Sequence, residues 1–160
     1  MNVELRETVE ADLPILFAHQ ADPDASAMAA FPSRDWDAFV AHQEKIQADP
    51  EVVTRTIVSG DEVVGAIGSF TIDGAREVGY WIDRAYWGEG IATSALEALL
   101  ALEPVRPLSA HVAVHNIGSR RVLEKCGFAI VREQHVDGVD EYLMRLEAPS
   151  EGGSSAKGGS

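Results

Sequence analysis

The sequence predicts a mixed α/β (α+β) fold, a single domain in which a central, mostly antiparallel, twisted sheet is flanked by about four helices. Two patterns predict this fold class. β-Branched segments joined by short turns fill residues 52–82, and apolar residues at helical spacing follow over 91–102. The length of 160 residues suits one compact domain, which we place at residues 1–148.

The N-terminal part is expected to form a strand and two helices. Residues 3–6 alternate like a short strand, and Thr8 is the expected N-cap of a helix that runs to about His19. An Asp-Pro-Asp sequence breaks this helix over 21–24. A second helix is predicted over 34–47 because its apolar residues return at helical spacing.

A strand-rich stretch follows. Strands are predicted over 52–58, 63–70 and 76–82, and the residues between them are rich in Gly, Asp and Ser. Three strands joined by such short turns should pair as an antiparallel meander.

The C-terminal half returns to helices and strands in alternation. We expect a helix over 91–102, a strand over 108–114, a helix over 117–126, and a hairpin of strands 129–136 and 141–146 around Asp137-Gly138. Asn116 is the expected N-cap and Gly127 the left-handed C-cap of the second helix, with Phe128 packing back on it. The predicted order is β-α-α-β-β-β-α-β-α-β-β.

Composition narrows the choice of partner. The chain has 26 acidic and 13 basic side chains, hence a formal charge of −13. A nucleic-acid partner needs clustered basic residues and is not expected. The charge favours a cationic partner such as an amine, although it is also explained by solubility alone.

Location is inferred from what the chain lacks. We expect no membrane partner, because no apolar run approaches the ~20 residues of a spanning helix, and the first residues do not resemble a signal peptide. Cys126 is the single cysteine and cannot form an internal disulfide, so we expect a cytoplasmic protein. Residues 149–160 are Gly/Ser-rich and predict a flexible tail.

The segment Gly88-Glu89-Gly90-Ile91-Ala92 joins a strand to a helix. Glycines let the backbone approach a ligand closely, and the free N–H groups and dipole at the start of a helix favour an anion such as a diphosphate. A tight turn without a ligand explains the same pattern. The dinucleotide-binding fingerprint needs a third glycine and the phosphate loop needs Gly-Lys-Ser/Thr, and neither is present.

Three spaced motifs are more specific than this turn. They are Gly-Tyr-Trp within residues 77–82, Trp-Gly-x-Gly-x-Ala within 86–93, and Asn-x-x-Ser…Glu-Lys-x-Gly-Phe over 116–128. Together they resemble the GNAT superfamily of N-acetyltransferases, and more narrowly its RimJ/RimL-like branch. The resemblance covers nearly the whole of residues 1–148 and implies a GNAT-like fold with acetyl-CoA as co-substrate and no metal.

The resemblance also assigns residues to CoA. It implies that the backbone between Gly88 and Ala92 holds the pyrophosphate, and that Trp81 and Ile82 offer backbone groups to the pantetheine arm. Asn116 should bond the same arm, Ser119 should lie near the thiol, and Arg121 or Lys125 should reach a phosphate. The expected cofactor-binding set is Trp81, Ile82, Trp87, Gly88, Glu89, Gly90, Ile91, Ala92, Thr93, Asn116, Ser119 and Arg121.

Two departures from the family pattern stand out. The wider superfamily often has Gln or Arg three residues before the first glycine, and this chain has Ala85. Glu89 places a carboxylate inside the expected pyrophosphate turn, which is unfavourable unless its side chain points away.

Acyl transfer from a thioester needs a neutral amine, so a proton must be removed directly or through water. Glu77 is the candidate base because, on an alternating strand, it shares a face with Gly79 and Trp81. The alternative is an exposed or salt-bridged strand residue, with Arg76 as one partner. Ser119 is the candidate acid or thiol-orienting group, with a helix-terminus hydroxyl as its alternative. Relatives often use a Tyr on this helix as acid, and residues 116–128 contain none.

The expected acceptor is a primary amine, either a small molecule or a peptide N-terminus. The main alternative function is a non-catalytic acyl-CoA-binding or sensor domain. A dinucleotide-dependent oxidoreductase is disfavoured by the missing third glycine. The exposed strands predicted near the C-terminus also allow a homodimer.

Overall fold

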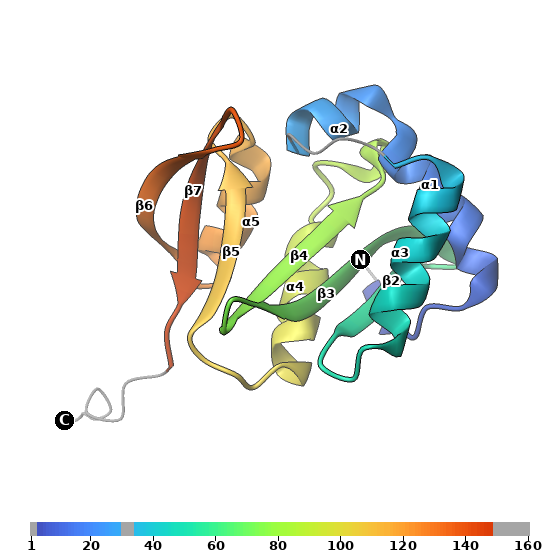
Figure 1. The fold of residues 1–160 in the computed structure, drawn as a ribbon, viewed down its shortest axis with the longest axis horizontal. Helices are drawn as coiled ribbons and strands as arrows, with labels where there is room; N and C mark the ends of the chain where they lie inside the picture. The colour runs from blue at the N-terminus through green and yellow to red at the C-terminus, as the bar shows by residue number, and fades with distance from the viewer. Residues whose placement is uncertain (1–2, 30–33, 149–160) are drawn as a thin grey trace.

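The structure is a computed structural model in which residues 3–29 and 34–148 are described. Helices and strands alternate in the predicted general order (Figure 1). The strands are β1 (Val3–Arg6), β2 (Val53–Ser59), β3 (Glu62–Ile72), β4 (Ala75–Ile82), β5 (Leu108–Ala113), β6 (Ala129–Val136) and β7 (Val139–Leu146). The helices are α1 (Leu13–Ala21), α2 (Pro23–Ala29), α3 (Trp36–Ala48), α4 (Ile91–Leu102) and α5 (Ile117–Lys125), with short 3₁₀ turns η1 (Glu10–Asp12) and η2 (Arg84–Tyr86).

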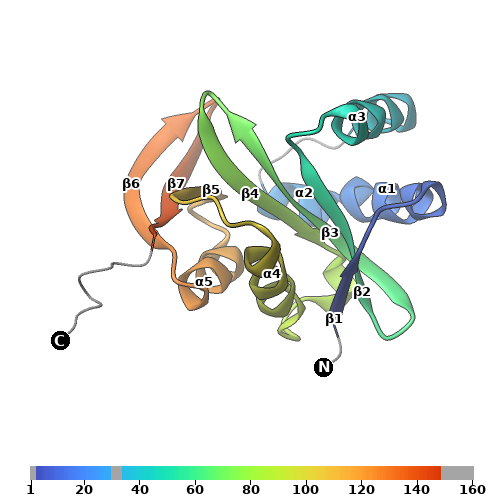
Figure 2. The ribbon, with the colours of Figure 1, turned by 90° about the horizontal axis from the view of Figure 1, so that it is seen from below.

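The seven strands form one sheet in the order β1-β2-β3-β4-β5-β7-β6. Every neighbouring pair is antiparallel except β4 and β5, which are parallel. Helices α4 and α5 cover one face of the sheet, and α1, α2 and α3 lie on the other (Figure 2). The predicted fold class is therefore confirmed, including the antiparallel meander over residues 53–82.

Two hairpins are closed by Asp-Gly pairs. Asp73 and Gly74 join β3 to β4 with φ of +51° and +82°, and Asp137 and Gly138 join β6 to β7 with φ of +51° and +80°. A two-residue turn with positive φ at both central residues has a backbone twist that matches the twist of the flanking strands. The hairpin predicted around Asp137-Gly138 is confirmed.

The main core lies between the sheet and the helices α4 and α5. Helix α4 presents Ile91, Ala95, Leu96 and Leu99, all of them buried, to the sheet. Helix α5 ends as predicted, with Gly127 at φ +99° and the Phe128 N–H bonded to the carbonyl of Leu123. Phe128 is buried in the main core, as predicted.

The N-terminal region departs from the prediction in two ways. Residues 21–24 contain a break of one residue, Asp22, after which Pro23 opens α2. Proline is favoured in the first turn of a helix, so Pro23 begins a helix here as well as ending one. Thr8 is not an N-cap. Its hydroxyl lies within hydrogen-bond distance, 3.0 Å, of the Thr56 hydroxyl, and η1 begins after Val9.

Asp12 is a buried polar anchor of this region. Arg6 donates two hydrogen bonds of 2.8 Å to its carboxylate, while Thr56 and the Val9 N–H donate one each. The Arg6 bonds, helped by those from Val9 and Thr56, lower the pKa of Asp12 against the opposing effect of burial. The site thus ties β1, η1 and β2 together.

Among the described residues, no helix combines the length and the apolar character that a membrane span requires. The predicted tail over 149–160 lies outside the described residues.

Candidate active site

Strands β4 and β5 pair at only two positions. Arg76 lies opposite Leu108, and Glu77 lies opposite Ser109. Both strands continue past these positions but separate, as Figure 1 shows. Separation of two parallel strands leaves N–H and C=O groups of the facing edges without ladder partners. The gap therefore provides backbone hydrogen-bonding groups for an extended ligand.

A cavity of about 560 Å³ lies at the open end of this gap. The end of β4, the glycine turn, the first turns of α4 and α5, and helix α2 all contribute to its wall. Trp81 belongs to one face of β4, while Tyr80 and Ile82 belong to the other. All three line the cavity, which therefore lies around the C-terminal end of β4.

The glycine turn presents free backbone donors to this cavity. Gly88 and Gly90 both have φ of +81°, which non-glycine residues rarely adopt. Gly90 is the N-cap of α4 and makes no side-chain capping bond. The first helical bond runs from the Ser94 N–H to the Gly90 carbonyl, so the N–H groups of the first turn of α4 have no acceptor within the helix. This is the arrangement that binds a phosphate or diphosphate.

The electrostatics of the cavity also favour an anion. Its lining contains no Asp or Glu, but it contains Arg121 and Lys125 from α5. This is a marked local exception in a chain of net charge −13. Glu89 is exposed and does not belong to the lining, which resolves the difficulty of a carboxylate within the turn.

Two tryptophans fix the wall on the β4 side. The Trp87 indole donates a hydrogen bond of 2.9 Å to the Ile82 carbonyl, which folds the loop back on the end of β4. The Trp81 indole donates one of 3.2 Å to the carbonyl of His19 in α1. The glycine turn and the N-terminal helices are thereby held against the same strand.

The first turn of α5 contributes Asn116 and Ser119. The Asn116 side chain accepts the Ser119 N–H at 3.2 Å, which confirms the predicted helix cap. The Nδ2 group of Asn116 makes no hydrogen bond to any described residue, so the capping role leaves it free to bind a ligand. Tyr80 from β4 reaches the same turn, with its hydroxyl 2.7 Å from Ser119 Oγ and bonded to the Ser119 carbonyl.

Tyr80 is the site residue that sequence reasoning missed. The family resemblance points to a tyrosine within residues 116–128, but here the side chain comes from the facing strand. Its place on β4, on the opposite face from Glu77, was the available signal. Burial raises the pKa of Tyr80 to about 12, although its hydrogen bond to Ser119 acts in the opposite direction.

Glu77 lies on the other face of β4 and is buried. Its carboxylate is 2.8 Å from Nδ1 of His111 on β5, and Nε2 of His111 is 3.9 Å from the carboxylate of Glu141 on β7. The alternative of a Glu77–Arg76 salt bridge is wrong, because Arg76 pairs with Glu103 on the opposite side. Glu77 does not line the cavity. It lies where β4 and β5 still pair, at the closed end of the gap.

Comparison with known proteins shows to which family the chain belongs. Residues 2–129 match the model of the acetyltransferase (GNAT) domain, which is most of the chain. The chain belongs to the GNAT acetyltransferase family. Its sequence is 32% identical over 114 residues to the Probable N-acetyltransferase YjcK of Bacillus subtilis (strain 168). That match covers 66% of this chain and 60% of YjcK, so the chain spans less than two thirds of that relative.

Solved GNAT structures share the fold. The spermidine N-acetyltransferase of Vibrio cholerae, in complex with CoA and spermine, superposes with a TM-score of 0.79 at 17% identity, over 91% of this chain and 95% of that one. The aminoglycoside acetyltransferase AAC(6')-Ib, in complex with coenzyme A, gives 0.75 at 20% identity over the same shares. At these identities the likeness establishes the fold.

The structure of this GNAT domain brings most of the predicted cofactor residues to one cavity. Eleven of them line it: Trp81, Ile82, Trp87, Gly88, Gly90, Ile91, Ala92, Thr93, Asn116, Ser119 and Arg121. Glu89 and the candidate base Glu77 do not. The cluster is assembled from segments that the sequence alone places far apart.

The remaining apolar, cysteine and metal-ligand candidates lie in different parts of the structure. Met28 of α2 lines the cavity, whereas Trp36 packs edge-on against Phe17 in a local aromatic cluster. Phe31 lies outside the described residues. Cys126 is half-buried, and burial raises its pKa. Within the described part of the chain, no group of three or more His, Cys, Asp or Glu side chains has an arrangement that suits a metal ion.

Proposed function

We propose that this GNAT domain is an acetyl-CoA-dependent N-acetyltransferase that acts on a primary amine by direct attack in a ternary complex. One observation carries the proposal. A cavity whose described lining holds no carboxylate joins the free N–H groups of α4 to Asn116 and to the Tyr80–Ser119 pair at the end of β4. Membership of the GNAT acetyltransferase family supports the same reaction class.

The residues present fit CoA. The turn from Gly88 to Ala92 offers backbone donors for the pyrophosphate, and Arg121 and Lys125 add positive charge at the same cavity. The unpaired edge of β4 near Trp81 and the free amide of Asn116 suit an amide-bearing arm that binds like an added strand. Acetyl-CoA itself supplies the activated acyl group as a thioester.

Removal of the amine proton is assigned to the Glu77–His111 pair. Glu77 is buried, whereas His111 is about one third exposed, so His111 is the member that can meet an acceptor. A carboxylate bound to Nδ1 holds the proton on that nitrogen and leaves Nε2 as the acceptor. We therefore assign Glu77 a positioning role behind His111 rather than direct contact with the amine. Figure 1 shows that β4 and β5, the strands that carry the two residues, separate beyond their short paired segment.

Tyr80 and Ser119 are assigned to the thiol side. A phenol with a pKa of about 12 keeps its proton at neutral pH. An ordinary thiol has a pKa of about 8.5, so full proton transfer from Tyr80 to a departing thiolate is unfavourable. A hydrogen bond to the developing charge has no such cost. Tyr80, oriented by Ser119, thus stabilises the thiolate, which takes its proton from solvent.

The acceptor class is a cationic amine, either a small molecule or a peptide N-terminus. The formal charge of −13 attracts such substrates, and Glu141 places a second carboxylate beside His111. The bound spermine in the Vibrio cholerae structure supports a basic acceptor by analogy of fold. The proposal also includes three further points. The chain belongs to the RimJ/RimL-like branch, lies in the cytoplasm and forms a homodimer.

Two measurements test this function. Acetyl-CoA should raise the unfolding temperature of the protein, and NADH should not. A free-thiol assay over diamines, aminoglycosides and N-terminal peptides should then detect amine-dependent CoA release. Stabilisation without thiol release across the whole panel would instead indicate a sensor that binds acyl-CoA without turning it over. An absence of stabilisation by any CoA ester would refute the cofactor assignment.

A further inference from the structure

A second cavity, of about 600 Å³, lies at the closed end of the gap between β4 and β5. Arg76 and Ser109, which line it, belong to the two positions where these strands pair. The glycine turn follows the opposite end of β4, so the length of this strand separates the two cavities. With a rise of about 3.3 Å per residue, that separation is roughly 20 Å.

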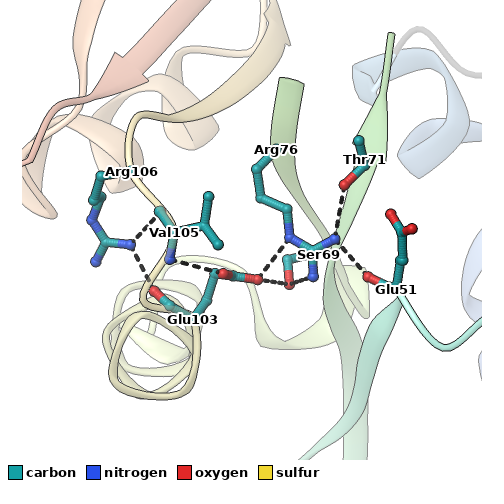
Figure 3. A network of polar contacts seen from close by, with 7 residues as sticks. All are labelled: Glu51, Ser69, Thr71, Arg76, Glu103, Val105 and Arg106. Atoms are coloured by element: carbon teal, nitrogen blue, oxygen red, sulfur yellow. Dashed lines mark hydrogen bonds and ion pairs between the residues drawn. The ribbon is translucent and has the colours of Figure 1, made fainter. Parts of the chain in front are cut away.

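Three arginines line this cavity: Arg76, Arg106 and Arg145. They are a sizeable share of the 13 basic side chains in a chain that carries 26 acidic ones. One carboxylate residue, Glu51, is also in the lining. Figure 3 shows the Glu51 carboxylate pointing away from Arg76, which instead bonds the Glu51 backbone carbonyl.

The charge of Arg76 is already neutralised. Its Nε lies 2.9 Å from Oε1 of Glu103, and Ser69 donates to the same oxygen (Figure 3). The Val105 N–H donates a hydrogen bond to the other carboxylate oxygen of Glu103, Oε2. Burial alone would raise the pKa of Glu103, but these three partners together lower it, so the carboxylate stays ionised. Glu103 is fully occupied and does not compensate a second arginine.

Arg106 and Arg145 therefore remain uncompensated. Arg106 donates from Nη1 to the backbone carbonyls of Glu103 and Val105 and pairs with no carboxylate of the described residues. Arg145 makes no hydrogen bond or ion pair within the described part of the chain, and its Nε is buried. A buried donor without an acceptor is costly, and native proteins usually satisfy it.

A hydroxyl donor accompanies these arginines. Ser109 is buried, lines the cavity and lies directly opposite Arg145 in the β5–β7 register. Its hydroxyl has no hydrogen-bond partner among the described residues. Two guanidinium forks and a hydroxyl around one cavity match the oxygens of a phosphate or carboxylate group.

We propose that this cavity binds a small multivalent oxyanion, held by Arg106, Arg145 and Ser109. The site is distinct from the glycine turn, and the inference does not rest on the proposed acetyl transfer. Phosphate-bearing and polycarboxylate ligands share the required chemistry, and the test below separates these two sources.

Calorimetric titration of the whole protein with pyrophosphate and with citrate tests the site, in the presence and in the absence of saturating CoA. Under the proposed function CoA occupies the glycine turn, so binding that persists with CoA present reports on the second cavity, and the arginine variants test that cavity whether or not CoA binds. Arg145→Gln and Arg106→Gln should each weaken this binding about tenfold or more. Arg132→Gln removes the same charge from exposed β6, where Arg132 contacts Gln134, and should leave the binding unchanged.

The comparison among the three variants decides the outcome. Losses confined to Arg145→Gln and Arg106→Gln, seen with and without CoA, support the site, and the tighter of the two anions identifies its ligand class. Two independent arginines keep the test valid if one variant does not fold, as judged by circular dichroism. Equal losses in Arg132→Gln, or no saturable binding by the unsubstituted protein, would overturn the proposal.

Discussion

The hydroxyl of Tyr80 lies 2.7 Å from the hydroxyl of Ser119, although the two residues are 39 positions apart in the chain. Tyr80 comes from β4 and Ser119 from the first turn of α5, so the contact crosses the sheet–helix interface beside the cavity. Under the proposed function, this pair places the phenol of Tyr80 at the cavity, near the position expected for the thiol.

Replacing Tyr80 tests the assigned stabilisation of the thiolate. Tyr80→Phe removes one hydrogen bond to a developing charge, and we expect kcat to fall about tenfold while the Kd for CoA stays within about twofold. Steady-state kinetics and calorimetry measure the two quantities. Tyr142→Phe, a half-buried tyrosine on β7 that packs against the same core, is the matched control and should keep its kcat. A Tyr80→Phe enzyme with unchanged kcat would remove Tyr80 from the mechanism.

The Glu77–His111 pair should behave as one unit. Glu77→Gln and His111→Gln are each expected to lower kcat by about a hundredfold or more and to leave CoA affinity intact, because general base catalysis contributes that much. The double variant should be little worse than either single one. Glu133→Gln on exposed β6 is the control for loss of one carboxylate. Multiplicative losses in the double variant would show that the two residues act separately.

The glycine turn permits a comparison of two positions with the same backbone conformation. Gly90 and Gly138 have φ of +81° and +80°, and a Cβ at either position would meet no atom within 4 Å. Replacement by Ala should therefore cost each a similar backbone strain of about 1 kcal/mol. Only Gly90→Ala should weaken acetyl-CoA binding, by about tenfold, because it shifts the N–H groups at the start of α4. Equal affinities for both variants would contradict the pyrophosphate assignment.

The Arg6–Asp12 anchor predicts an acid-dependent stability. The pKa of folded Asp12 is lowered, so its contribution is present above the unfolded value and is lost as the pH falls through the folded one. Asp12→Asn should cost about 2 kcal/mol of unfolding free energy at neutral pH and flatten the loss of stability below about pH 4. Asp24→Asn, on a carboxylate that is 73% exposed, should cost less than about 0.5 kcal/mol. Urea denaturation at several pH values measures both.

Features set by neighbouring residues could be predicted from the sequence. The glycine turn, the start of α4, the Asn116 cap, the Gly127 C-cap and the Asp137-Gly138 hairpin all depend on local backbone preferences, and all are present. These features include the parts of the cavity that are made by backbone. Two local predictions were wrong: Thr8 is not an N-cap, and Pro23 both ends one helix and begins another.

Contacts between distant segments could not be predicted. The Glu77–His111 bond joins residues 34 positions apart and depends on the two-position parallel register of β4 and β5. Without that register, Arg76 was an equally reasonable partner for Glu77. The placement of Tyr80 against Ser119 likewise depends on how α5 packs on the sheet.

Transfer of a labelled acetyl group tests the central claim most directly. Acetyl-CoA with a deuterated acetyl group is incubated with the protein and a cationic primary amine, and mass spectrometry follows the label. The account predicts that the label appears on the amine nitrogen, with one free CoA released per acetylated amine, and that Gly90→Ala slows the transfer at limiting acetyl-CoA. Acetyl-CoA that stays intact across the panel of diamines, aminoglycosides and peptide N-termini, while still binding the protein, would contradict it.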